Sequence, residues 1–300
     1  MKKILIIGSL NLDTTIETSE IPSPGETVIG MNVSQNAGGK GANQAYAAGK
    51  LGSNVSMLGS VGNDTAGKRL IESLQAVGVD TEGIRSCDDT VTGQAFVTVD
   101  GDGQNSIIVI PGANSRTTVK YLKERSEYME SADIIVTQLE IPFETVSYIR
   151  DYAVSRGKAL IVDPAPAVEG IPDDFWEGID YIKPNETELA VLSGKGWAAE
   201  SDICSAAGEL IKKGVKNVLV SLGDKGCMLV DSDGTAAFEA ISVDAVDTTA
   251  AGDTFTGAFA VALSEGLEPA EAVSFAQKAA AIAVTRKGAQ PSIPSRQELE

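Results

Sequence analysis

The chain has 300 residues, of which 43% are hydrophobic and 22% charged, a composition typical of globular proteins. This length and composition exclude a wholly disordered or fibrous chain and allow a large buried core. The 24 Lys and Arg against 42 Asp and Glu give a formal net charge of −18, which disfavours nucleic acid or an anionic membrane as a partner.

The sequence contains no His, so a general base has to be Asp, Glu, Lys, Tyr or Cys. The first apolar run, Ile4–Ile7, is too short for a signal peptide or a membrane span, and we interpret it as a buried strand. The three cysteines, Cys87, Cys204 and Cys227, are far apart and form no CxxC pair. They indicate reduced thiols and a cytoplasmic location.

Two segments, residues 12–36 and 91–110, contain paired β-prone runs around turn residues. Each segment predicts an antiparallel hairpin. Two hairpins inserted into an α/β unit can pair into a small separate sheet, which is a candidate lid or interface. The four predicted strands are Thr14–Ile16, Glu26–Ile29, Gln94–Val99 and Ser106–Ile110.

Elsewhere, short continuous apolar runs alternate with helical patterns, which predicts an α/β fold. Continuous apolarity is typical of parallel strands covered on both faces. We therefore expect one domain over residues 1–300, with a doubly wound, mostly parallel sheet and helices on both faces. The predicted strands are Ile4–Ile7, Ile134–Gln138, Leu160–Val162, Tyr181–Lys183, Val218–Ser221 and Cys227–Val230. The predicted helices are Gly67–Ala76, Glu144–Arg156, Ser205–Lys213 and Thr254–Ser264.

Two glycine-rich stretches resemble phosphate-binding loops only in part. Residues 38–41, Gly-Gly-Lys-Gly, do not match the P-loop pattern. Ser34 occupies the position where the pattern requires its first Gly, and Gly41 occupies the position where it requires Ser or Thr. Residues 194–199, Gly-Lys-Gly-Trp-Ala-Ala, satisfy a dinucleotide fingerprint but follow a helical pattern instead of a strand. A nicotinamide-dependent dehydrogenase is therefore disfavoured.

Polar residues follow the first strand and the Gly-rich stretch. Amides, a carboxylate and an amine at a strand end suit a neutral polyhydroxylated ligand, and Glu140 follows another strand at the same rim. The alternative is structural: Asn11 and Asp13 as turn formers and Asn43 as a helix N-cap. The residues concerned are Asn11, Asp13, Lys40, Asn43 and Glu140.

Two further motifs have both a structural and a functional interpretation. Asn185-x-x-Glu188 is a capping-box pattern, or it places Glu188 beside nucleotide phosphates, where it holds Mg²⁺ directly or through water. Residues 221–226 form a glycine turn between two predicted strands. This turn is a simple hairpin connection or a backbone platform for an adenine nucleotide.

Small residues at 247–252 lead into a helix that begins near Gly252. The backbone N–H groups of residues 250–253 lack intrahelical partners and, with the helix dipole, form a predicted anion site. Asp253 then lies beside the bound anion. Its carboxylate either complements the helix dipole or accepts a proton from a hydroxyl that attacks a phosphoryl group.

Together these segments resemble the ribokinase-like (PfkB) carbohydrate kinase family, from Ile6 to about Arg296. Three stretches carry the resemblance: Gly38–Ala45, Pro184–Glu188 and Ala245–Phe255. The last two of these match family signatures.

The resemblance implies phosphorylation of D-ribose at its 5-hydroxyl by ATP, with Asp253 as the base. It implies that the N–H groups of Ala250, Ala251 and Gly252 hold the transferring phosphoryl group. The implied sugar-binding residues are Asn11, Asp13, Gly39, Lys40, Gly41, Asn43, Glu140 and Asp253. The implied nucleotide-binding residues are Asn185, Ser221, Gly223, Asp224, Gly226, Gly252 and Gln277.

The family resemblance also implies Mg²⁺ near Glu188, an activating K⁺ ion beside the anion site, and a homodimer formed through the lid. The implied K⁺ site comprises Asp247, Thr249, Ala283, Arg286, Gly288 and Ser292. Two alternatives stay open: another kinase of the family, acting on 2-deoxyribose, fructose or a nucleoside, and a sugar-binding regulator that has lost catalysis.

Overall fold

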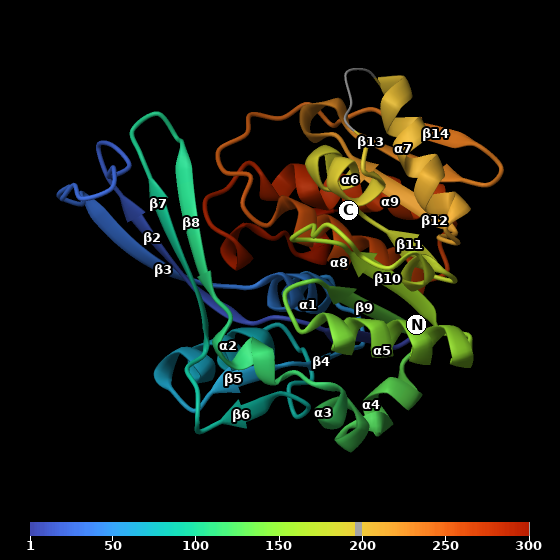
Figure 1. Cartoon of the computed structure of the whole chain (residues 1–300), viewed down its shortest axis with the longest axis horizontal. Coiled ribbons are helices and arrows are strands. Elements are labelled where there is room, and N and C mark those ends of the chain that lie inside the picture. The colour runs from blue at the N-terminus through green and yellow to red at the C-terminus, as the bar shows by residue number, and fades with distance from the viewer. Residues whose placement is uncertain (196–199, 300) are drawn as a thin grey trace.

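The computed structural model describes residues 1–195 and 200–299 and contains an eight-stranded sheet between two layers of helices (Figure 1). The strand order is β14-β13-β12-β11-β10-β9-β1-β4, and the pairs from β4 to β12 are parallel. The predicted doubly wound α/β architecture is thereby confirmed. The strands are β1 (Ile4–Ile7), β4 (Val55–Leu58), β9 (Ile134–Gln138), β10 (Ala159–Asp163), β11 (Tyr181–Ile182), β12 (Asn217–Ser221), β13 (Cys227–Asp231) and β14 (Thr235–Phe238).

The last two strands run antiparallel to their neighbours. The run Cys227–Val230 forms β13 as predicted. Its assignment to a parallel strand is wrong, and the hairpin interpretation of residues 221–226 is confirmed. The connection from Ser221 to Cys227 is a short turn that reverses the chain, and a parallel pairing requires a long crossover.

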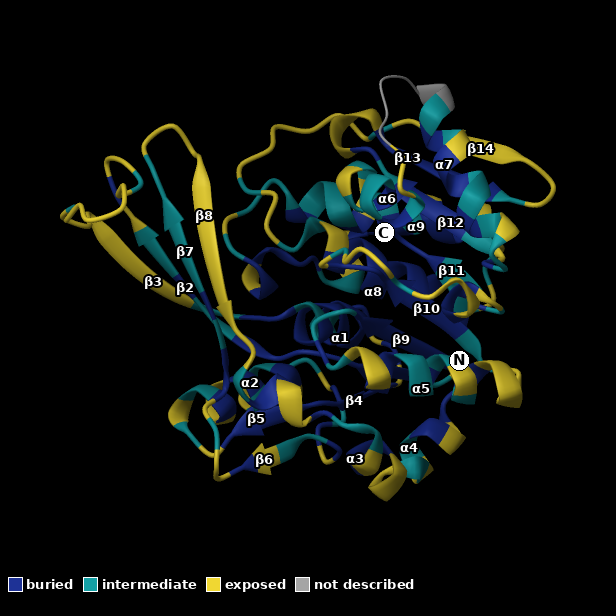
Figure 2. Cartoon of the chain, viewed as in Figure 1, coloured by how far each residue is buried: buried dark blue, intermediate teal, exposed yellow. Residues whose placement is uncertain are grey.

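Side chains alternate across the strands and build one hydrophobic core on each face of the sheet. Ile4 and Ile6 face one core, and Leu5 and Ile7 face the other. Figure 2 shows these strands buried between the helical layers. The first face carries α1 (Lys40–Lys50), α2 (Thr65–Gln75), α8 (Ala251–Ser264) and α9 (Pro269–Ala283). The second carries α3 (Val119–Glu124), α4 (Ser126–Ser131), α5 (Phe143–Arg156), α6 (Glu186–Ser193) and α7 (Glu200–Lys212).

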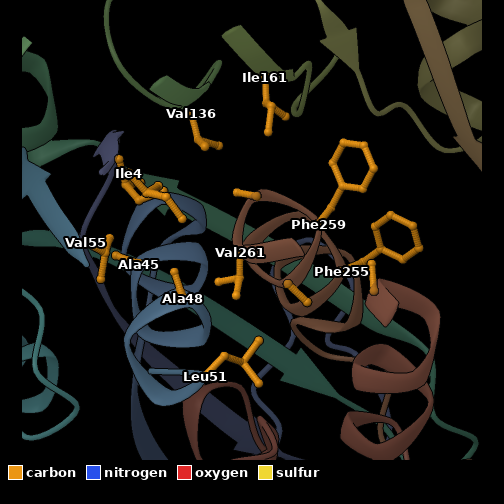
Figure 3. Close-up of a cluster of buried hydrophobic side chains, with 14 of the residues drawn as sticks. Ile4, Ala45, Ala48, Leu51, Val55, Val136, Ile161, Phe255, Phe259 and Val261 are labelled. Atoms are coloured by element: carbon orange, nitrogen blue, oxygen red, sulfur yellow. The ribbon is translucent and has the colours of Figure 1, made fainter. Parts of the chain in front are cut away.

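Helices α1 and α8 pack closely because small residues face one another. A Cβ added at Gly257 would lie 2.7 Å from both the Cβ of Ala47 and the backbone O of Gln44. Figure 3 shows Ala45 and Ala48 of α1 beside Val261 of α8 in the same apolar cluster. This packing brings the first turns of two helices, more than 200 residues apart in sequence, to one place.

A second sheet of four strands projects away from the large sheet, in the order β3-β2-β7-β8 (Figure 1). The prediction that two hairpins pair into a small sheet is confirmed, with β2 and β7 as the central, parallel pair. Its strands are β2 (Asn11–Glu17), β3 (Asn32–Gly38), β7 (Gly93–Val99) and β8 (Asn105–Ile110). Two short strands, β5 (Ser60–Gly62) and β6 (Arg85–Cys87), form a separate parallel pair.

The prediction of a strand at Glu26–Ile29 is wrong, because the partner of β2 is β3, at Asn32–Gly38. Residues 26–29 lie in the connecting loop, and Ile29 is 87% exposed there. The pairing of Asn11 with Gly38 sets the register, so tertiary pairing overrides the local β propensity of residues 26–29. In the described part of the chain, no helix is long and apolar enough to cross a membrane.

Candidate active site

The carboxyl ends of the parallel strands carry a group of polar side chains. Gln138 ends β9, Asp163 ends β10, Ser221 ends β12, and Lys183 directly follows β11. Open α/β sheets bind ligands at this edge, outside the strand carboxyl ends. Helices α1 and α8 begin at the same edge, since the side chains of their first turns bond to one another.

The first turn of α8 has an unusual backbone. Ala250, its N-cap, has φ 60°, and it is the one residue other than Gly with positive φ in the described chain. A left-handed conformation costs an Ala side chain energy and is typical of functional loops. The Ala251 N–H donates to the Thr248 carbonyl at 3.2 Å, whereas the N–H groups of Gly252 and Asp253 have no acceptor among the described residues. The predicted anion site therefore has free donors at Gly252 and Asp253, while the Ala251 donor is engaged in a turn.

Asp253 is buried, with 7% of the residue exposed, and two side-chain amides hold its carboxylate. Asn43 Nδ2 donates to Oδ2 at 2.9 Å, and Gln44 Nε2 donates to Oδ1 at 3.3 Å. Both amides come from the first turns of α1, so the α1–α8 packing sets the orientation of this carboxylate. The structural interpretation of Asn43 as a helix N-cap is wrong, because Gly39 is the N-cap of α1, with φ 86°.

A second polar layer lies behind Asp253. Gln44 Nε2 also donates to Asp163 Oδ2 at 2.9 Å, and Gln138 Nε2 donates to Gln44 Oε1 at 2.6 Å. Lys183 Nζ lies 4.0 Å from Asp163 Oδ2, and both side chains are buried. None of these four residues was predicted from the sequence as a site residue. Gln138 and Lys183 were within predicted strands, and their place at strand carboxyl ends was the available signal.

The predicted sugar-binding residues converge beside Asp253. Glu140 Oε2 accepts hydrogen bonds from Ser9 Oγ at 2.5 Å and from the Lys40 N–H at 3.1 Å. Asn114, which was not predicted from the sequence, donates to Asn11 Oδ1 at 2.7 Å. The Asp13 carboxylate packs against Gly38, where a Cβ would collide with it.

The electrostatics of this group are dominated by buried carboxylates. Burial, with the charges of Glu140 and Asp253, raises the pKa of Asp13 to about 7. Burial also raises the pKa of Glu140, against the opposing effect of Lys40. For Lys40, burial lowers the pKa, but the surrounding carboxylates outweigh it and the net pKa is raised. These carboxylates are Asp163, Asp253, Glu140 and Glu188. A neutral polyol with hydroxyl donors matches such an acceptor-rich site.

The predicted nucleotide-binding residues lie on neighbouring strands. Asn185 and Ser221 form a parallel β-bridge, and the Ser221 N–H donates to the Pro184 carbonyl at 3.0 Å. Gly223 and Gly226 have positive φ in the turn that follows, while Asp224 is exposed. Gln277 of α9 donates to the carbonyls of Phe238 and Glu239 at 3.4 and 3.3 Å, which places it beside the end of β14.

The capping box at Asn185 and Glu188 is present. Asn185 Oδ1 accepts from the Glu188 N–H, and Glu188 Oε2 accepts from the Asn185 N–H, both at 2.8 Å. This structural role leaves Glu188 Oε1 without a hydrogen bond to the described residues. No three acidic or Cys side chains of residues 1–195 and 200–299 form a metal-binding group. A single carboxylate fits Mg²⁺ that keeps most of its waters and binds nucleotide phosphates.

The predicted K⁺ residues lie in two segments, residues 247–249 and 283–292, which are joined by hydrogen bonds. Asp247 Oδ2 accepts from the Gly288 N–H at 2.8 Å, and Asp247 Oδ1 accepts from the Thr249 N–H and hydroxyl at 2.9 and 2.6 Å. The N–H groups of Val246 and Asp247 donate to the Val284 carbonyl. Hydrogen bonds to Thr249 and Gly288 hold the pKa of Asp247 below its usual value against the effect of burial. A carboxylate and loop carbonyls are oxygen donors, which fit a hard monovalent cation.

Other members of the predicted K⁺ set have local partners. The Ala283 carbonyl accepts from the Arg286 N–H at 3.1 Å, and Ser292 Oγ donates to the Ala289 carbonyl at 2.7 Å. The Arg286 guanidinium pairs with Glu298 at 2.5 Å. Of the dinucleotide fingerprint, Gly194 ends helix α6, as its sequence context predicted, and residues 196–199 lie outside the described residues.

Comparison with known proteins shows similarity along the whole chain. The sequence profile of the pfkB family carbohydrate kinases matches residues 1–296. The ribokinase of Haemophilus influenzae is 39% identical over 297 residues, 99% of this chain and 97% of that protein. The deoxyribokinase of Salmonella typhimurium is 35% identical over 296 residues, also 99% and 97% of the two chains. The structure of Arabidopsis thaliana ribokinase complexed with ribose and ATP has a TM-score of 0.92 at 37% identity, and covers 99% of this chain and 97% of that one.

Proposed function

The chain belongs to the pfkB family of carbohydrate kinases, and from this premise we propose that it transfers the γ-phosphoryl group of ATP to the 5-hydroxyl of D-ribose. The observation that carries the proposal is the Asp253 carboxylate, held by Asn43 and Gln44 at the first turn of α8. The acceptor-rich group around Asp13 and Glu140 supports a sugar beside it. The names of the ribokinases among its relatives support ribose as that sugar.

In the proposed reaction, Asp253 accepts the proton of the sugar hydroxyl, and the oxygen of this hydroxyl forms a bond to the γ-phosphorus. The bond between this phosphorus and the β–γ bridging oxygen breaks, and ADP leaves with that electron pair. The free N–H groups of Gly252 and Asp253 stabilise the charge on the transferring group. Glu188 would hold Mg²⁺, which when bound neutralises charge on the nucleotide phosphates.

The alternatives to a ribose kinase are a kinase of the same family with another substrate and a sugar-binding regulator that has lost catalysis. A kinase for 2-deoxyribose is supported by the deoxyribokinase relative at 35% identity. A nucleoside substrate is disfavoured, because only 5% of the residues are aromatic and a base needs an aromatic or apolar pocket. A regulator without catalysis is also disfavoured, because sugar binding alone needs neither Asp253 nor the free N–H groups of α8.

A coupled ADP-release assay over ribose, 2-deoxyribose, fructose and a panel of nucleosides tests the proposal. We expect ribose to have the highest kcat/KM. A higher kcat/KM for any other acceptor would reassign the substrate, and ribose binding without ADP release would support the regulator.

We also propose that K⁺ binds at the loops of residues 246–249 and 283–292 and fixes the α8 N-terminus. Asp247 lies three residues before Ala250, so order in this loop is transmitted to the donors of Gly252 and Asp253. We expect kcat to be several-fold higher in KCl than in NaCl at fixed ionic strength. Equal rates in the two salts would contradict this part of the proposal.

A homodimer is proposed through the projecting sheet, which also serves as a lid over the sugar. Strand β8 lies at its edge and exposes Ile107, Ile108, Val109 and Ile110. Exposed apolar residues on an edge strand invite a partner. The free thiols of Cys87, Cys204 and Cys227 support a reducing compartment such as the cytoplasm.

A further inference from the structure

Lys183 lies directly behind the first turn of α8, although it belongs to a different element. It follows β11, and 7% of its side chain is exposed. A Cβ added at Gly252 would lie 3.4 Å from Lys183 Nζ, so the ammonium group is adjacent to the free N–H groups of this turn. The dipole of α8 and the ammonium group therefore present positive charge to the same place.

The ammonium group of Lys183 is incompletely paired. Its nearest acid is Asp163, at 4.0 Å, and no hydrogen bond joins Nζ to any described residue. Asp163 Oδ2 already accepts from Gln44, and its Oδ1 has no partner in the described chain. A buried ammonium with three unused donors is costly unless an anion completes its shell.

We infer that Lys183 is a further catalytic residue, whose ammonium group donates hydrogen bonds to the transferring phosphoryl group. This inference rests on the proposed kinase function. Carboxylates outnumber amines around the site, so an arriving triphosphate needs a local cation. The charge of Lys183 stabilises the phosphoryl oxygens as the bond to ADP breaks.

The test compares Lys183→Met with Lys216→Met, whose lysine is exposed and pairs with Asp180 away from these strand ends. We expect Lys183→Met to lower kcat about 10²–10³-fold, the usual loss for one donor to a developing anion. The KM for ribose stays within threefold, and Lys183→Arg retains more activity than Lys183→Met because it keeps the charge. Lys216→Met behaves as the wild type. A kcat for Lys183→Met within threefold of the wild type would overturn the inference.

A calorimetric arm separates catalysis from a structural role and does not depend on turnover. Lys183→Met should weaken binding of a non-hydrolysable ATP analogue at least tenfold and binding of ADP by less than threefold, because Lys183 faces the γ-phosphoryl position. Equal losses for the two nucleotides would overturn the inference. Failure of the proposed function has a different signature, namely a wild-type chain that phosphorylates no sugar.

The double variant Lys183→Met/Asp163→Asn guards against misfolding, because it removes both buried charges together. We expect it to fold and to keep the loss of kcat and of ATP-analogue affinity. Wild-type turnover in the double variant would show that Lys183 serves only to pair Asp163, and would overturn the inference.

Discussion

The two amides that hold Asp253 are themselves fixed by further side chains. Gln138 donates to the oxygen of Gln44 at 2.6 Å, so the Gln44 NH₂ group faces the carboxylates of Asp253 and Asp163. Gln290 donates to the oxygen of Asn43 at 3.4 Å. Each amide is thereby locked in one orientation, which preorganises the proposed base.

Replacing Asp253 with Asn should lower kcat about 10²–10⁴-fold, because the variant cannot accept the hydroxyl proton. The ribose dissociation constant should change by less than tenfold, since the shape of the site is kept. Steady-state kinetics and calorimetry with ribose measure these two effects. Asp151→Asn, at an exposed site on α5, is the control and should leave both unchanged. Turnover of Asp253→Asn near the wild-type rate would refute the assignment of the base.

Asp13 should make stability depend on pH, because its pKa is raised to about 7 in the folded chain and is about 3.9 when unfolded. The folded state therefore holds the proton more tightly, and the contribution of this group to stability falls as the pH rises from about 4 to about 7. Asp13→Asn removes the charge, so it should be more stable than the wild type at pH 8, by at most about 4 kcal/mol.

At pH 4 the stability gap between Asp13→Asn and the wild type should nearly close, because Asp13 is then neutral in the folded chain. Urea unfolding at the two pH values measures the difference. An equal gap at both values would mean that the Asp13 carboxylate is not destabilised by its buried surroundings.

At the scale of elements, the contact between α1 and α8 decides the geometry of the site. Gly257 of α8 has no space for a Cβ beside Gln44 and Ala47. Gly257→Ala should therefore separate the helices, lower stability by about 1–3 kcal/mol, and lower kcat by displacing Asn43 and Gln44 from Asp253. Thermal unfolding and steady-state kinetics measure the two losses.

Gly208→Ala in α7 is the matched control, because an added Cβ there meets nothing within 4 Å. It should raise stability by about 0.5–1 kcal/mol through helix propensity and leave kcat unchanged. If Gly257→Ala behaved like Gly208→Ala, the close helix contact would not position the site.

Elements with a strong local signal could be predicted from the sequence, and elements defined by pairing could not. The start of α8 was predicted because small residues precede a long apolar helix, and it begins at Ala251. Strand β3 was missed because Asn32–Gly38 is polar and mostly exposed, so only its pairing with β2 makes it a strand. Gln44 and Lys183 were missed for a related reason, since their roles depend on contacts with distant carboxylates.

At the scale of the whole molecule, the projecting sheet is the proposed dimer interface. Both sides of β8 are apolar, with Ile107 and Ile108 56% and 65% exposed. Ile108→Asp should therefore shift the proposed dimer to a monomer in sedimentation experiments at micromolar concentration, because it places a charge in the interface.

Val154→Asp on α5, at an apolar residue exposed to 42%, is the control and should leave the sedimentation coefficient unchanged. A wild-type chain that sediments as a monomer, or an Ile108→Asp variant that remains dimeric, would remove β8 from the interface.

The partnership of α1 with α8 also has a consequence for biosynthesis. On a ribosome, α1 emerges about 200 residues before α8, so this apolar face of the sheet, covered early only by α1 and α2, stays incomplete until translation is nearly finished. Nascent chains of this protein should therefore engage chaperones late into elongation. Chains released before residue 264 should aggregate, since they lack the helix that seals that side.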